Sequence, residues 1–196
     1  SYSKTFPGSP RVNVSLTSAM SQNSQTKNVN LTLPTLQTNM ERVFPFAPKE
    51  GSKKGIFQNI NFQYTSRLEN RVITNEENLF KAEMFRDARS GMIHTIPIST
   101  NFKVLKHLSM TVGSNYQEVW TPQTIRYRNY DDSIQSATKD TIRKFDAFRT
   151  YNFNASLGTT IYGTFNFGDD KKIQSIRHTI RPAVSYGYSP SFEKEY

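Results

Sequence analysis

The 196-residue sequence contains no cysteine and no long apolar run. Without cysteine, the chain can form neither a disulfide framework nor a thiolate metal site. No window approaches the ~18 consecutive apolar residues of a membrane-spanning helix. A helical membrane protein is therefore excluded, whereas a membrane β-barrel, which crosses the bilayer with strands, is not.

Apolar residues are scarce as a whole. Hydrophobic residues make up 35% of the chain and the mean hydropathy is -0.64, which is below the apolar share of a typical soluble domain. A soluble protein of this length would have little material for a core. Because the chain nevertheless has a regular pattern, we expect something other than a thick protein core to cover its apolar faces.

Signatures of catalysis are also missing. The sequence has no Gly-x-Ser-x-Gly elbow, no glycine-rich phosphate loop and no closely spaced histidine pair. His94, His107 and His178 fall in three separate segments, so no metal site is expected. We predict that the protein is not an enzyme and has no cofactor.

The chain does contain apolar and polar residues that alternate with a period of two. In 151–165, for example, aromatic and aliphatic residues alternate with asparagine, serine, threonine and glycine. This alternation is typical of strands with one apolar and one polar face. The ranges predicted as strands are 11–22, 27–44, 55–70, 91–104, 108–120, 148–166 and 172–189.

The remaining segments are predicted to be irregular, apart from one short loop helix within 75–86, where apolar residues recur at helical spacing. Residues 1–10 and 121–148 are expected to be loops because they are polar or charged. The apolar set shifts phase at Pro34, which predicts a bulge there, since proline cannot donate to the ladder. Pro97 and Pro182 are expected to disrupt their strands for the same reason.

The predicted connections differ in length, being short after the second, fourth and sixth strands and long after the third and fifth, with a short connection after the first as an exception. In an up-and-down sheet, alternate connections share an end, so one end would carry tight turns and the other long loops. Outer-membrane barrels have this asymmetry, with periplasmic turns and extracellular loops, and their strands have ~9–11 alternating residues. We therefore predict an all-β antiparallel up-and-down transmembrane β-barrel segment of about seven long strands, with 1–196 part of a single barrel domain.

Other classes share part of this pattern. A soluble β-sandwich binding module also alternates, but its strands are commonly ~5–6 residues long and it needs a second apolar layer. The net charge of +9 is compatible with nucleic acid as a partner. Stacking on bases is disfavoured, however, because the rings share a face with isoleucine, valine and leucine rather than with arginine. A porin or an uptake receptor would have the same strands as the predicted barrel, so these alternatives remain open.

Charged residues on the polar side of the predicted strands are expected to line the lumen of the barrel. A charged, amide-rich wall suits the passage of a hydrated anionic head group. These lumen-facing candidates are Arg67, Glu69, Lys103, Arg177 and Arg181.

The run from Ile176 to Pro190, in which Pro182 precedes the pattern Tyr-x-Tyr-x-Pro, resembles a strand of the LptD family of lipopolysaccharide-assembly proteins. Residues 26–46 and 91–97 are similar to parts of its divergent members, and the resemblance covers most of the chain. It implies a barrel in the outer membrane of a Gram-negative bacterium that delivers lipopolysaccharide to the outer leaflet. The implied partners are lipopolysaccharide, a plug lipoprotein of the LptE type, periplasmic bridge proteins and outer-membrane lipids, and not nucleic acid.

The chain departs from the family pattern in three respects. It has no periplasmic jellyroll domain, it lacks the cysteines of some members, and about seven strands are too few to enclose a large lumen. We therefore expect an internal fragment of the barrel wall.

Overall fold

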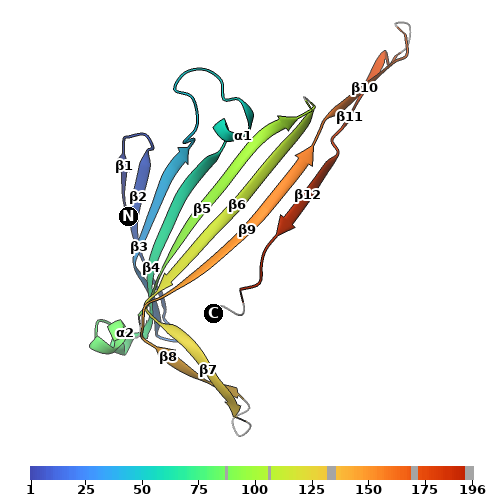
Figure 1. Cartoon of the computed structure of the whole chain (residues 1–196). Helices are drawn as coiled ribbons and strands as arrows, with labels where there is room; N and C mark the ends of the chain where they lie inside the picture. Colours follow the sequence, from blue (N-terminus) through green and yellow to red (C-terminus); the bar gives the residue numbers. More distant parts are fainter. Residues whose placement is uncertain (87, 106, 132–135, 169–171, 193–196) are drawn as a thin grey trace.

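The computed structural model describes residues 1–86, 88–105, 107–131, 136–168 and 172–192. Eight strands form one antiparallel sheet in the order β1-β2-β3-β4-β5-β6-β9-β12 (Figure 1). Their bounds are Tyr2–Phe6 (β1), Val12–Asn23 (β2), Asn28–Val43 (β3), Asn61–Asn75 (β4), Arg89–Val104 (β5), Leu108–Thr121 (β6), Asp146–Gly158 (β9) and Ala183–Tyr188 (β12).

The strands run up and down, each long strand pairing antiparallel with its neighbours in the sheet. The described sheet does not close on itself, since β1 and β12 form its two outer edges. The predicted all-β, up-and-down architecture is therefore confirmed, and the open sheet is consistent with part of a larger barrel. None of the helices in the described residues has the length and apolar character to cross a membrane.

The start of the third predicted strand is wrong. Gly55–Gln58 forms a short helix (α1), and β4 begins at Asn61 and continues to Asn75, beyond the predicted end at 70. Local hydrogen bonds stabilise the helical turn, because Asn59 Nδ2 donates to the Gly55 carbonyl at 2.7 Å and the Lys54 amide donates to Gln58 Oε1 at 2.7 Å. Side chains that bond to nearby backbone compete with a strand ladder in this way.

The helix expected within 75–86 is present as two short pieces, a 3-10 turn at Glu76–Asn78 (η1) and an α-helix at Ala82–Arg86 (α2). Two predicted loops are wrong in part, because each contains strands. Residues 1–10 include β1, which pairs with β2, and 121–148 include a separate hairpin of Thr124–Asp131 (β7) and Ser136–Ile142 (β8).

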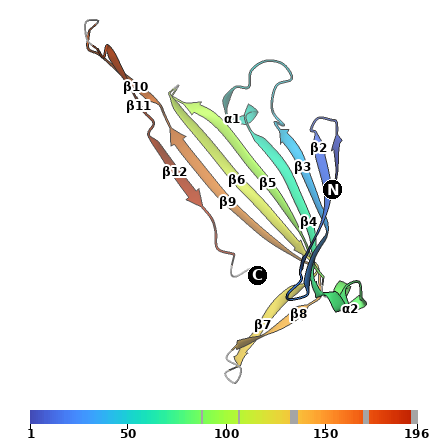
Figure 2. The same cartoon turned by 180° about the vertical axis from the view of Figure 1, so that it is seen from behind.

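The last two predicted strands are each divided in two. β9 ends at Gly158 and is followed by Ile161–Asn166 (β10), while Ser175–Ile180 (β11) precedes β12. β10 and β11 form their own two-stranded ladder, which projects beyond the sheet (Figures 1 and 2). The break includes Pro182, which has no amide hydrogen to continue a ladder. The tip of this hairpin, 169–171, lies outside the described residues.

The predicted asymmetry between tight turns and long loops is also wrong. The connections at the end that carries α1 are 7–11, 44–60, 105–107 and 159–182, and those at the other end are 24–27, 76–88 and 122–145. Each end thus has both short and long connections, because the strand bounds around α1 and around the β10–β11 hairpin differ from those predicted.

The tightest packing in the described residues lies where the 76–88 connection folds back onto the sheet. Met84 of α2 packs against Val29 and Leu31 of β3 and Val72 of β4, and all four are at most 4% exposed. This small cluster covers only the lower ends of two strands, so most of the sheet has no second protein layer of the kind a sandwich requires.

Replacing Met84 with alanine should release the 76–88 connection while leaving the sheet intact. Truncating a buried methionine costs ~2–5 kcal/mol, and this cost falls on a short segment that has few other buried contacts. Limited proteolysis of the full-length protein should cleave within 76–88 about tenfold faster. Phe85→Ala is the matched control, since that ring is 63% exposed. Equal cleavage rates in the two variants would contradict this account of the packing.

Candidate functional site

The strand register assigns the side chains of the sheet to two chemically distinct faces. Met110, Leu157 and Val184 form one cross-strand row, and the next residues along, Thr111 and Ser156, form a row on the opposite side. We call these the apolar face and the polar face. The apolar face carries the even-numbered residues of β4, β5, β6 and β12 and the odd-numbered residues of β9, and the polar face carries the others.

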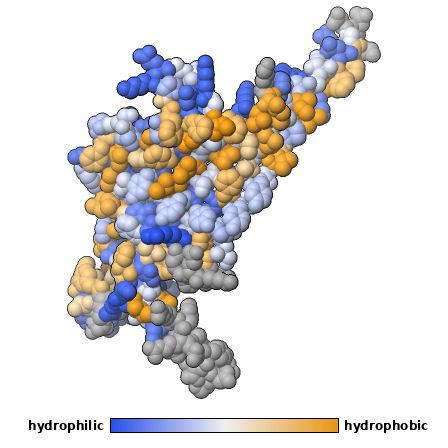
Figure 3. Space-filling model, viewed as in Figure 1, coloured by the Kyte–Doolittle hydropathy of each residue, from blue (hydrophilic) through white to orange (hydrophobic). Residues whose placement is uncertain are grey.

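The apolar face is largely uncovered. Val184, Tyr186 and Phe153 are 75%, 63% and 40% exposed. A continuous band of hydrophobic side chains crosses β5, β6 and β9 in Figure 3. An exposed apolar surface of this extent indicates contact with a membrane or with another protein.

Polar tips of aromatic side chains form a network on the same face. The Tyr64 hydroxyl bonds to Nδ1 of His94 at 2.8 Å, and the Trp120 ring lies 4.1 Å from the His94 ring between centroids. Rings with an apolar body and a polar tip concentrate where hydrocarbon meets water.

Glu118 is the acceptor at the centre of this network. It accepts hydrogen bonds from Tyr116 at 2.7 Å and from Trp120 Nε1 at 2.9 Å, and its carboxylate lies 3.4 Å from Arg149 Nε. Trp120 is next to the last residue of β6. A paired charge near a strand end, surrounded by rings, is typical of the head-group level of a bilayer rather than of its centre.

The structure places the five predicted lumen candidates in three groups. Arg67 and Glu69 lie together on the polar face of β4 and form an ion pair at 2.7 Å. Lys103 and Arg181 line one depression at the other end of this face. Arg177 is separate, because it belongs to the β10–β11 hairpin, where its guanidinium stacks 4.7 Å from the Tyr162 ring centroid.

Lys103 and Arg181 line a depression of about 530 Å³, which we call the basic depression. His107 also lines it, and the other polar side chains around it are hydroxyls. None of the described residues that line it is acidic. Cationic and hydroxyl donors without a competing carboxylate suit a phosphate or a carboxylate ligand. The lining hydroxyl residues are Ser109, Ser156, Thr159 and Thr160.

Sequence reasoning missed three residues of the polar side. His107 was considered only as a metal ligand, and no group of three or more ligand side chains suited to a metal occurs among the described residues. Arg71 and Arg89 lie directly opposite each other in the register of β4 and β5. Arg71 continues the odd-numbered series of Arg67 and Glu69 on the polar face. It was not recognised as a candidate because the predicted strand ended at residue 70.

The predicted bulge at Pro34 is confirmed. Leu33 and Pro34 of β3 together face a single residue on β2 and a single residue, Asn70, on β4. Asn70 Nδ2 donates to the Leu33 carbonyl at 2.8 Å, which satisfies an acceptor that the interrupted ladder leaves free. The extra residue keeps Leu31 and Leu36 on the apolar face despite their odd and even numbers.

The other two prolines behave differently from Pro34. Pro97 interrupts the β4–β5 ladder between Phe62↔Ile98 and Thr65↔Thr95 without shifting the register, and its pairing with β6 continues. Pro182 separates β11 from β12. Of the three, only Pro34 changes which face the following residues occupy.

Comparison with known proteins gives one match. No curated protein and no solved structure matches the chain. The family described as LptD protein matches residues 1–196, that is, the whole of the chain. Members of this family act in lipopolysaccharide transport in the outer membrane, and the open, two-faced antiparallel sheet agrees with a portion of such a barrel. The chain belongs to the LptD family.

Proposed function

We propose that this chain forms part of the wall of an outer-membrane translocon that inserts lipopolysaccharide into the outer leaflet of a Gram-negative bacterium. The observation that carries this proposal is the separation of faces across the eight-stranded sheet, with an apolar face that the described residues leave largely uncovered, in a chain of the LptD family. The apolar face would contact lipid, and the polar face would line the aqueous interior.

The polar face suits the head of lipopolysaccharide, which is rich in hydroxyls and carries anionic groups. Serine, threonine and asparagine side chains can exchange hydrogen bonds with sugars, and the basic depression offers Lys103 and Arg181 to a phosphate. In this function the substrate moves without a covalent change, so the wall needs no catalytic residue, metal or cofactor. The family resemblance adds a plug lipoprotein of the LptE type and periplasmic bridge proteins as partners, and no nucleic acid.

Photocrosslinking in cells tests the proposal. A photoreactive amino acid at Ser156, in the basic depression, should give lipopolysaccharide adducts in the full-length protein, and these should disappear when the supply of new lipopolysaccharide is stopped. At Phe153 of the same strand, which lies on the apolar face and does not line the basic depression, any adduct should persist, because it would come from resident membrane lipid.

Two results would count against this function. Unchanged surface lipopolysaccharide after depletion of the protein would contradict it. Conductance for small solutes, together with no adduct at Ser156, would favour a porin instead.

A further inference from the structure

A second depression lies where β5 extends beyond β4. β4 begins at Asn61, which pairs with Ser99, so residues 100–104 of β5 have β6 on one side and no described strand on the other. The connection that carries α1 runs beside this free edge, and Thr100 Oγ1 donates to the Ile56 carbonyl at 2.8 Å. We call the space of about 670 Å³ between α1 and the β5–β6 ladder the notch.

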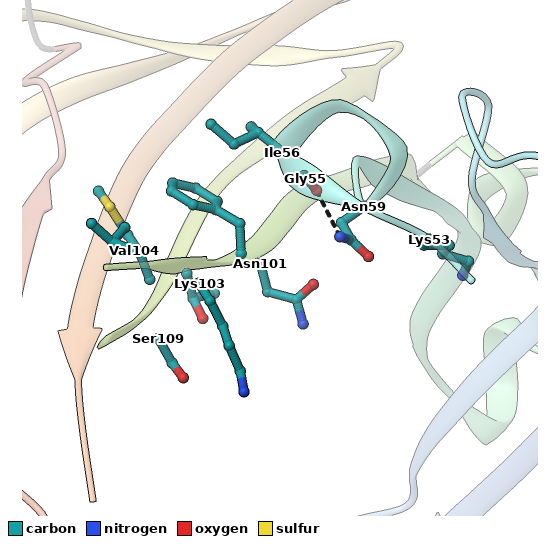
Figure 4. Close-up of a pocket in the computed structure, with 11 residues that line it drawn as sticks. Lys53, Gly55, Ile56, Asn59, Asn101, Lys103, Val104 and Ser109 are labelled. Carbon is teal, nitrogen blue, oxygen red and sulfur yellow. Dashed lines mark hydrogen bonds between the residues drawn. The ribbon is translucent and has the colours of Figure 1, made fainter. Parts of the chain in front are cut away.

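The notch opens to both faces of the sheet. Figure 4 shows Asn101, Lys103 and Ser109 on one side of the ladder and Ile56 and Val104 on the other. This division follows from strand alternation, because successive residues point to opposite faces. The lining is therefore amphipathic, with amide, hydroxyl and ammonium groups toward the polar face and aliphatic groups toward the apolar face.

The charge of the notch is positive. Lys53 and Lys103 line it, and none of its described lining residues is acidic. The Lys53 ammonium lies 2.9 Å from the centroid of the Phe44 ring, a contact that orients this side chain. The volume is within the range of ~300–1,000 Å³ that is usual for small-molecule sites.

The free ladder edge fixes the level of the notch in a membrane. Unpaired backbone groups cannot lie against hydrocarbon, so residues 100–104 must be at the height of the lipid head groups. The cap of Met84 over Val72 marks the opposite boundary, because that part of the apolar face is covered by protein. Between these limits lie residues 62–71 of β4, which match the ~9–11 residues that a tilted strand needs to cross a bilayer.

We propose that the notch binds an acylated lipid with an anionic phosphate head. The phosphate contacts Lys103, Lys53 adds a second positive charge to the lining, and the first part of an acyl chain lies on Ile56 and Val104 along the apolar face. This inference rests on the proposed placement of the wall in a bilayer. Two kinds of lipid have both a phosphate head and acyl chains, namely anionic phospholipid and the lipid part of lipopolysaccharide.

Photocrosslinking in nanodiscs tests the notch. The full-length protein with a photoreactive amino acid at Val104 is placed in discs of phosphatidylcholine alone, or with added phosphatidylglycerol or lipid A. Adducts to the anionic lipids should exceed those to phosphatidylcholine about tenfold, and Lys53→Gln with Lys103→Gln should remove this preference. Lys54→Gln is the matched control, because Lys54 neighbours Lys53 but does not line the notch. Competition between phosphatidylglycerol and lipid A then identifies the preferred source.

A second crosslinker position separates failure of the notch from failure of the proposed function. At Phe153, in the middle of the apolar face, adducts should form with all three lipids. If Phe153 reacts while Val104 shows no preference for anionic lipid, or if the two lysine substitutions leave that preference unchanged, the notch proposal is overturned and the barrel wall stands. If Phe153 gives no adduct, the placement in the bilayer fails, and the notch proposal fails with it.

Discussion

An arginine in place of Ala155 should destabilise the folded protein in membranes by ~2–4 kcal/mol, the cost of a cation near the bilayer midplane on the lipid face of a barrel. Ala155 lies between Val112 of β6 and Tyr186 of β12 in the apolar band of the sheet. A charge there has no anionic partner in its row. The measurement is urea unfolding of the full-length protein in lipid vesicles, followed by the heat-dependent shift in gel mobility of folded barrels.

The matched control is Asn152→Arg. This residue is in the same strand and is exposed, but it lies on the polar face, opposite Asn115 of β6. Its substitution should change stability by less than ~1 kcal/mol, because the new side chain reaches water. If the two arginines have equal effects, the apolar face does not contact lipid and the barrel-wall interpretation fails.

Reversing the charge of the basic depression should reduce lipopolysaccharide delivery about tenfold or more. Arg181→Glu combined with His107→Glu places two carboxylates in a depression that Lys103, Arg181 and His107 line. The loss of one charge-assisted hydrogen bond to a phosphate is sufficient to weaken binding roughly tenfold. Appearance of pulse-labelled lipopolysaccharide at the cell surface measures the effect, with gel mobility as the check on folding.

Arg177→Glu is the control for this experiment, since Arg177 stacks on Tyr162 in the projecting hairpin and lies outside the sheet. Delivery should stay close to normal in this variant. Equal losses in the two variants would show that overall charge matters and the depression does not. No loss in either would remove the depression from the transport path.

The strands that span the sheet were predictable because alternation is a local property of the sequence. A strand with one face against lipid and one face against water has apolar residues at every second position. The sequence then has to reveal only where each strand begins, ends or is interrupted. The bulge at Pro34 was predictable for the same reason, since the phase change between Leu31 and Leu36 is visible in the sequence.

The strands of the β7–β8 hairpin could not be found in this way. The β7–β8 hairpin extends away from the eight-stranded sheet in Figure 1, and its segment is strongly charged, with charges on neighbouring positions such as Lys139 and Asp140. At Gly55–Gln58 the apolar residues fit either a helix or a strand. Local side-chain bonds to the backbone decide between these conformations, and a pattern of hydropathy does not include them.

The candidate site, like the fold, was predictable only where it depends on a local pattern. Alternation placed Lys103 and Arg181 opposite the apolar residues of their segments, and it could not show that they share a depression. Their meeting depends on the pairing of β6 with β9 and of β9 with β12, and on the break at Pro182. These contacts join residues far apart in the chain, so no local pattern reports them.

The open edges of the sheet have a consequence for how the segment folds. β12 consists of Ala-Val-Ser-Tyr-Gly-Tyr, which is uncharged, has no proline and is exposed throughout. Such an edge is a template for another chain, and neither lysine nor a covering loop blocks it within the described residues. Kept apart from the strands that complete its barrel, the segment should polymerise edge to edge. A monomeric state during biogenesis would therefore require the β12 edge to stay shielded until a neighbouring strand pairs with it.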